Sequence, residues 1–457
     1  MPELSDILNV LLLRDYNTRL VVLATAVLGM ATGVVGTFML LRKRALLGDA
    51  LSHTTLPGVG LAFILATLFG IDGKSLSVLL TGALLMSMAG AGTILLIRRY
   101  TRLKEDAALG ITLSVFFGAG VAILGVIQQM GLSSAAGLQT FIYGSTASMI
   151  ASDAVFIALV AAMVIFACTL LFKELKLLCF DEDFAQGQGW PVGLLDAALA
   201  GLMVLVVVVG LQAVGLILIV AMLIIPAAAA RFWTERLLSM TIIAAFIGAI
   251  SAASGAAASA LYPNLPSGAM IVLVALVIFI FSALVAPARG VIPRALRQQT
   301  LNQRVDRQHL LRAMYEFLKA TDDKRYNEDN TPALDAGFDD LLHCRSWNRK
   351  KLTRLLHSAQ QDGLIRTNSD GRWQLTQRGA GAAVRIVRNY RLWEIYLINY
   401  ADVAPNHVDR DADRIEHVLS PTLIRELEAL LERDGRIPII QFNPHKITPI
   451  MPASASD

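Results

Sequence analysis

The chain has 457 residues, of which 55% are hydrophobic and only 17% are charged, so it is too apolar for an ordinary soluble protein. Residues 1–288 contain 14 basic and 14 acidic side chains, whereas residues 289–457 contain 26 and 22. The sequence therefore predicts a membrane domain followed by a soluble-like region, and the whole net charge of +4 lies in that second region. This small basic excess is a modest indication of a nucleic-acid or membrane-surface partner.

Three features exclude other classes of protein. The three cysteines are scattered without C-x-x-C spacing, which predicts neither a disulfide framework nor a zinc ribbon. Gly73–Ser75 reads Gly-Lys-Ser but lacks the upstream glycine of a P-loop, so we expect no ATP to bind to this chain. Pro2–Leu13 lacks a basic start and a small-residue cleavage site, which argues against a cleavable signal peptide.

An all-α, polytopic membrane domain is predicted for residues 1–288. After a possible surface helix at Glu3–Leu13 come nine hydrophobic segments, each near the roughly 20 residues that a spanning helix needs. Residues 130–152 are too polar for an ordinary span and are expected to form a re-entrant or extracellular segment. The nine segments are residues 19–41, 52–70, 76–97, 108–130, 153–172, 193–211, 213–230, 238–261 and 268–287.

The basic residues of this domain indicate its orientation. With nine spans, most of the basic loop residues fall on one side, which the positive-inside rule places in the cytoplasm. The amino terminus is then expected outside and the chain from Arg289 onward in the cytoplasm. The residues on the basic side are Arg42, Lys43, Arg44, Arg98, Arg99, Arg102, Lys104, Lys173, Lys176, Arg231 and Arg236.

One carboxylate and one imidazole stand at the head of the second apolar segment. Asp49 and His53 are four residues apart, so a helix would place both on one face. Together they form half of a binding site for a first-row divalent metal ion, and ionisable groups in a membrane indicate function. The alternative is an ordinary helix start near the headgroups, with Asp49 in the first turn and His53 facing water.

The stretch Gly48–Phe63 (GDALSHTTLPGVGLAF) resembles the signature of metal-ion ABC transporter permeases, and the likeness runs over about residues 1–290. This resemblance implies a multi-pass bacterial inner-membrane permease that imports manganese, zinc or iron. It also implies a separate ATPase subunit, a periplasmic or lipoprotein metal-binding protein, and a homodimer or a pair with a second permease. Asp49 and His53 would then lie in the transport pathway. Further matching blocks are Leu103–Gly120, Phe141–Ser148, Phe180–Pro191, Val214–Arg231 and Ser267–Leu284.

An acidic segment on the basic side of the membrane domain resembles the coupling helix that docks into the ATPase subunit of these transporters. The alternative is a solvated connecting loop. Its expected coupling residues are Asp181, Glu182, Asp183 and Phe184.

A winged helix-turn-helix is predicted for residues 306–380, after a basic linker at residues 289–305. Three amphipathic helices, at Asp306–Lys319, Leu334–His343 and Asn348–Gly363, precede two short strands joined by an Asp-Gly turn. The third helix would enter the major groove of DNA, unless its basic residues form only a solvated face. Those residues are Arg349, Lys350, Lys351 and Arg354.

Arg388–Tyr396 and Val408–Leu427 resemble the metal-binding and dimerisation helices of diphtheria-toxin-repressor-type regulators, most specifically at Glu416–Ser420 (EHVLS). The likeness covers about residues 306–432, and residues 381–440 are expected to form the helical metal-binding and dimerisation domain. The resemblance implies a site for an iron or manganese ion, with one ligand from the first helix of the winged domain. The alternative is a solvated face with no shared site. The matching ligand positions are His309, Asp413, Glu416 and His417.

The second metal site of those regulators is incomplete here. Glu394 matches one ligand, but Tyr390 and Asp409 stand where histidines are expected, which argues against ordinary metal binding. Residues 441–457 form a Pro- and Ser-rich tail.

Two functions of different classes follow. The first is a permease subunit for divalent metal ions, which is not itself an enzyme. The second is a metal-sensing, DNA-binding regulator carried on a membrane anchor. Both can hold in one chain, or the tail can serve as a metal gauge that inhibits transport.

Overall fold

The computed structural model describes residues 14–44, 46–70, 75–129, 149–261, 265–322, 335–344, 347–400 and 421–433. The chain divides into two compact units, Met1–Arg294 and Ala295–Asp457. The predicted surface helix at Glu3–Leu13, most of the polar segment 130–152 and the tail 441–457 lie outside the described residues.

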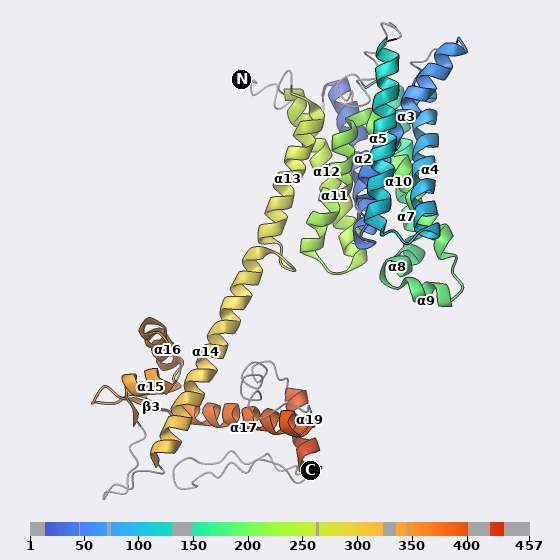
Figure 1. The fold of residues 1–457 in the computed structure, drawn as a ribbon. Helices are drawn as coiled ribbons and strands as arrows, with labels where there is room; N and C mark the ends of the chain where they lie inside the picture. The colour runs from blue at the N-terminus through green and yellow to red at the C-terminus, as the bar shows by residue number, and fades with distance from the viewer. Residues whose placement is uncertain are drawn as a thin grey trace, which may run out of the picture. The chain divides into compact units, whose positions relative to one another are not determined.

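The first unit is an all-α bundle (Figure 1). A described helix coincides with each of the nine predicted hydrophobic segments. Of the two short helices, α9 lies in the segment that resembles a coupling helix, and α8 was not predicted. The bundle helices are α2 (Tyr16–Leu41), α3 (Leu47–Leu68), α4 (Leu76–Tyr100), α5 (Glu105–Gln129), α7 (Ala151–Leu170), α8 (Phe172–Phe180), α9 (Glu182–Gly187), α10 (Val192–Val214), α11 (Leu216–Trp233), α12 (Leu237–Leu261) and α13 (Ser267–Val285).

Eight of the described helices are long and apolar enough to cross a membrane. The remaining predicted segment is α11, whose apolar part, Leu218–Trp233, is shorter. The prediction of about nine spans therefore depends on whether α11 crosses the bilayer.

Gly215 separates α10 from α11 and reverses the direction of the chain. Its φ of 82° lies in the left-handed region that glycine adopts readily. The turn brings Gly210 against the side chain of Ile219. Consequently the start of α10 and the end of α11 lie at the same end of the bundle (Figure 1).

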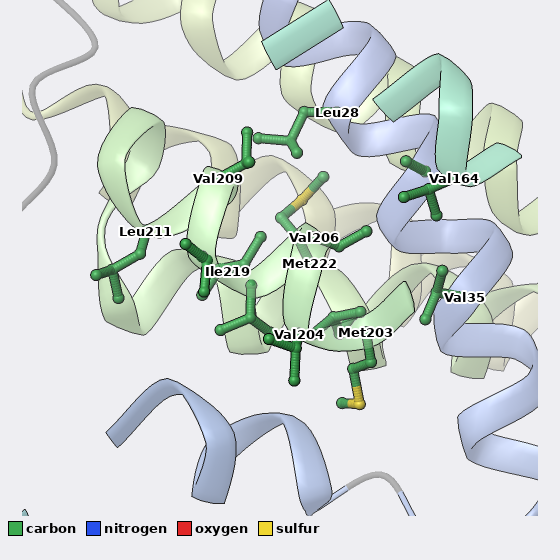
Figure 2. Close-up of a cluster of buried hydrophobic side chains, with 14 of the residues drawn as sticks. Leu28, Val35, Val164, Met203, Val204, Val206, Val209, Leu211, Ile219 and Met222 are labelled. Carbon is green, nitrogen blue, oxygen red and sulfur yellow. The ribbon is translucent and has the colours of Figure 1, made fainter. Parts of the chain in front are cut away.

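The core of the first unit is built from apolar side chains on helices far apart in the sequence. Figure 2 shows Leu28 and Val35 of α2 gathered with Val164 of α7 and with Met222 of α11. Gly29 of α2 approaches α12 closely, because glycine leaves no side chain between the two backbones. Close packing of this kind holds the helices in fixed relative positions.

The second unit contains a winged helix-turn-helix, as predicted. Its helices are α15 (Phe338–Cys344), α16 (Arg349–Gln361) and the later part of α14 (Val291–Asp322). β2 (Ile365–Thr367) and β3 (Trp373–Leu375) form the hairpin, whose turn contains Gly371 at a φ of 72°. Two further helices follow, α17 (Gln377–Tyr400) and α19 (Pro421–Arg433).

Two local details differ from the prediction. Residues 291–305 of the predicted linker are helical and continuous with the first helix, because Arg, Gln, Leu and Ala are good helix formers. The second helix begins at Phe338, and a short strand, β1 (Asp335–Ala336), precedes it. β1 pairs antiparallel with β3, which gives the sheet order β1-β3-β2.

Candidate functional site

Asp49 and His53 lie on one face of α3, as their spacing predicts. Asp49 is in the first turn, and its Oδ1 lies 3.4 Å from Nε2 of His53. The side chains are 38% and 20% exposed, so both remain accessible. Nδ1 of His53 is buried and has no hydrogen-bond partner among the described residues, and the ring packs edge-on against Phe117 of α5. The pair therefore presents an oxygen and a nitrogen donor side by side.

Glycines let the neighbouring helices approach α3 closely. Gly58 meets the backbone of Gly82 on α4, and Gly120 on α5 lies against Pro57. Pro57 lies inside α3 and removes one hydrogen bond from its backbone ladder. The position of the Asp49–His53 pair is thus set by α4 and α5 as well as by α3.

The predicted coupling residues lie on and beside α9, at the end of the bundle that carries the basic loops (Figure 1). Asp181 caps this helix by accepting a hydrogen bond of 2.9 Å from the backbone N–H of Phe184. Glu182 forms an ion pair of 2.7 Å with Arg42, whereas Asp183 has no ion pair with another described residue.

Large apolar side chains are exposed around α9. Phe180, Phe184 and Trp190 are 64%, 52% and 41% exposed. An apolar surface beside acidic groups is typical of a protein interface.

A cluster of three arginines and three carboxylates, which we call the ion-pair cluster, joins the basic loops of the first unit. Asp196 of α10 is its buried centre and was missed by the sequence analysis. An acidic residue near the start of an apolar helix was the signal that could have identified it. The members are Arg42, Arg44, Arg98, Glu105, Glu182 and Asp196.

In the second unit, α16 carries the predicted DNA-binding residues. Asn348 caps the helix by accepting from the backbone N–H of Lys350. The opposite face of α16 is buried in the core of the winged domain through Leu352, Leu356 and Ala359. The basic residues Arg349, Lys350, Lys351 and Arg354 are all exposed.

Two of these basic residues already have acidic partners. Arg349 lies 2.7 Å from Asp339, and Lys351 lies 2.8 Å from Asp306. Exposed ion pairs contribute little free energy, so a phosphate can replace these carboxylates at small cost. The face is basic, but less strongly than the sequence alone suggests.

The structure describes only some of the predicted metal ligands of the second unit. His309 lies on α14 and is half-buried, and Glu394 lies on α17. Asp413, Glu416 and His417 lie outside the described residues, so their convergence stays a prediction. Within the described ranges, no three His, Cys, Asp or Glu residues gather as a metal site.

Tyr390, which replaces an expected histidine, contacts an arginine. The guanidinium of Arg312, on α14, lies 3.5 Å from the centroid of the buried Tyr390 ring. Nε of Arg312 also donates to Glu316 at 2.8 Å. Burial lowers the pKa of Arg312, but Glu316 and Tyr390 more than offset this, so the pKa is raised overall. A fixed cation therefore links α14 to α17.

The bundle of apolar helices, with ionisable groups on one helix and an acidic segment at the basic end, defines a multi-spanning membrane transport domain joined to a winged helix domain. Residues 14–286 match the family model described as "ABC 3 transport family". The chain belongs to this family. Residues 376–445 match a second model, "Iron dependent repressor, metal binding and dimerisation domain".

Two relatives that are named for metal transport support the first of these assignments. The chain is 38% identical over 427 residues to the "Manganese transport system membrane protein MntC" of Bacillus subtilis (strain 168), covering 93% of this chain and 94% of that protein. It is 40% identical over 291 residues to the "Zinc transport system membrane protein TroC" of Treponema pallidum (strain Nichols), covering 64% of this chain and 96% of that protein.

A solved structure shares the fold of the membrane unit. "PsaBC from Streptococcus pneumoniae in complex with Fab" is 31% identical with a TM-score of 0.55, and the match covers 65% of this chain and 100% of the matched chain. The predictions of a metal-transport permease fold and of an attached repressor-like domain are confirmed.

Proposed function

We propose that this chain is the permease subunit of an ATP-binding-cassette importer for divalent metal ions. The observation that carries the proposal is the accessible Asp49–His53 pair on α3 of a membrane domain. Carboxylate and imidazole suit manganese, iron and zinc, and relatives of this chain are named for manganese and zinc transport. In a two-fold pair of permeases, two carboxylates and two imidazoles would meet the ion.

The proposal includes two kinds of partner. The exposed apolar side chains around α9 offer a docking surface for a separate ATPase subunit, which would supply the energy. A metal-binding protein outside the membrane would deliver the ion to the opposite end of the bundle.

Uptake of radioactive manganese by cells tests the metal pair. Asp49→Asn and His53→Gln should each lower the initial rate by at least about tenfold, because each replaces a carboxylate or an imidazole with a neutral amide that binds these metal ions more weakly. Asp106→Asn is the matched control, because Asp106 also lies in the first turn of a spanning helix but is exposed on α5. Unchanged uptake in both pathway variants would overturn the assignment.

A second candidate function, regulation by the second unit, is favoured by the winged helix and the matching repressor domain. We propose that metal binding positions α16 for DNA. The competing role is a gauge that slows transport when cytoplasmic metal is abundant.

A gel shift with the detergent-solubilised chain and DNA from upstream of its own gene separates these roles. A metal-dependent shift that is lost in Lys350→Ala/Arg354→Ala supports a regulator, with Arg378→Ala, exposed on α17, as control. No shift, combined with faster uptake when residues 300–457 are deleted, supports the gauge.

A further inference from the structure

The ion-pair cluster connects the predicted coupling segment with the start of the helix that carries the metal pair. Its six members come from the ends of α2, α4, α5, α9 and α10 and from the connection before α3. With three arginines and three carboxylates, the cluster is neutral overall. Buried pairs of this kind contribute little net stability but can specify a particular arrangement.

Arg42 forms the first link. One nitrogen of its guanidinium, Nη1, lies 2.7 Å from Glu182 of α9 and donates to the carbonyl of Leu178 at 3.0 Å. The other, Nη2, lies 3.0 Å from Asp196. The guanidinium is planar and rigid, so movement of Glu182 changes the contact with Asp196.

Arg44 forms the second link. Its Nη1 donates to the same oxygen of Asp196 that Arg42 contacts, and its Nε lies 2.7 Å from Glu105. The carbonyl of Arg44 accepts a hydrogen bond from the backbone N–H of Leu47, the first residue of α3. Arg44 is therefore anchored through its side chain and holds the start of α3 through its backbone.

The members of the cluster differ in exposure, and Glu182 is the most exposed of the four that link α9 to α3. The side chains of Arg42, Arg44 and Asp196 are 8%, 7% and 10% exposed, whereas that of Glu182 is 49% exposed. A protein that docks at α9 reaches Glu182 first. Nε of Arg42 is buried without a hydrogen-bond partner among the described residues, so its N–H is free to donate to a new partner when the cluster rearranges.

We propose that Glu182, Arg42, Asp196 and Arg44 are positioning residues that transmit movement of α9 to α3, and so to Asp49 and His53. The inference rests on the proposed function, because it assigns these residues a part in coupling ATP hydrolysis to metal transport. Two arrangements of the cluster would favour two positions of α3, and the docked ATPase would shift the balance between them.

The test measures the coupling ratio, which is the amount of metal imported per ATP hydrolysed. The full chain is reconstituted in liposomes with its ATPase subunit and metal-binding protein, and uptake of radioactive Mn²⁺ and release of phosphate are followed together. Glu182→Gln is compared with Glu235→Gln. Both changes remove a carboxylate that pairs with an arginine, but Glu235 pairs with Arg289, outside the ion-pair cluster and outside the coupling segment.

We expect Glu182→Gln to lower the coupling ratio by about tenfold while ATP hydrolysis continues. The reason is that the change weakens the energetic coupling between α9, where the ATPase docks, and the metal pair on α3. Glu235→Gln should keep the wild-type ratio. Asp196→Asn should lower the coupling ratio as Glu182→Gln does. If size-exclusion chromatography shows that Asp196→Asn does not fold, the result for Glu182→Gln tests the inference by itself.

A wild-type ratio in Glu182→Gln would overturn the inference, as would equal losses in Glu182→Gln and Glu235→Gln. A parallel fall in uptake and hydrolysis would also overturn it, since that indicates only weaker docking. No metal uptake by the wild-type assembly would instead overturn the proposed function, and this inference with it.

Discussion

At the scale of single residues, Arg312 and Tyr390 are the least expected contact. The resemblance to metal-dependent regulators places a histidine at Tyr390, which would bind a metal ion. Here a guanidinium lies over the aromatic ring and is held by Glu316. The junction of α14 and α17 is thus bridged by a permanent positive charge.

Arg312→Met should loosen this junction. Loss of a desolvated cation–π contact is expected to cost about 2 kcal/mol, which hydrogen exchange of α14 and α17 would detect as faster exchange. Arg307→Met is the control. Arg307 pairs with Asp362 at the surface, so its loss should change the exchange rates little. Equal exchange in wild type and Arg312→Met would contradict a structural role for the contact.

The cysteines give a second prediction at this scale. Burial raises the pKa of the Cys179 thiol, on α8, to about 11, so little thiolate is present near neutral pH. Labelling of Cys179 by maleimide should therefore be slow at pH 7 and rise about tenfold for each pH unit below the pKa. The measurement uses a variant with Cys168→Ser and Cys344→Ser.

The control for this experiment retains only Cys344. Cys344 is an exposed residue. Partial burial of its sulfur atom also raises its pKa, but it should be labelled faster than the less exposed Cys179. Labelling of Cys179 that does not change between pH 7 and pH 9 would contradict the raised pKa.

At the scale of helices, the approach of α2 to α12 depends on two facing glycines. A Cβ at Gly29 would meet the carbonyl oxygen of Gly248, and a Cβ at Gly248 would meet that of Gly29. Both atoms belong to backbones, which cannot rotate away. The two helices would have to separate to accommodate either change.

Gly29→Ala is therefore expected to destabilise the membrane unit by about 1–3 kcal/mol, the usual cost of overpacking. Thermal unfolding in detergent should show a lower midpoint. Gly201→Ala on α10 is the matched control, since no atom lies within contact distance of the added carbon and helix propensity favours alanine. A midpoint for Gly29→Ala as high as that of Gly201→Ala would refute the close approach.

At the scale of the whole molecule, α11 decides on which side of the membrane the second unit lies. Its 18 residues extend about 27 Å, close to the hydrocarbon thickness of about 30 Å. With α11 as a ninth crossing, the two ends of the membrane unit lie on opposite sides. With eight crossings they would lie on the same side.

Reporter fusions test this topology. Alkaline phosphatase fused after Leu301 should be inactive and green fluorescent protein at the same point should fluoresce, because we expect this part of the chain in the cytoplasm. Fusion after Lys74, on the opposite side, should give the reverse pattern. Phosphatase activity after Leu301 would contradict nine crossings.

Much of the architecture was predictable because it depends on local pattern. Apolar runs of spanning length indicated every long helix of the membrane unit, and helical periodicity followed by a strand, turn and strand indicated the winged domain. The Asp49–His53 pair was predictable for the same reason, since residues four apart share a helix face. The strand β1 was missed because two residues are too few to form a pattern.

Tertiary structure decided the contacts between distant parts of the chain. Asp196 is close to Arg42 and Arg44 only after α2, α3 and α10 have packed together. Similarly, Arg312 meets Tyr390 only when α14 lies beside α17. Sequence by itself determined which segments are helices and which ionisable residues share a turn, because neighbouring residues settle both. Packing between distant segments decides which charges are neutralised and which helices are linked to one another. Local sequence patterns do not predict such packing.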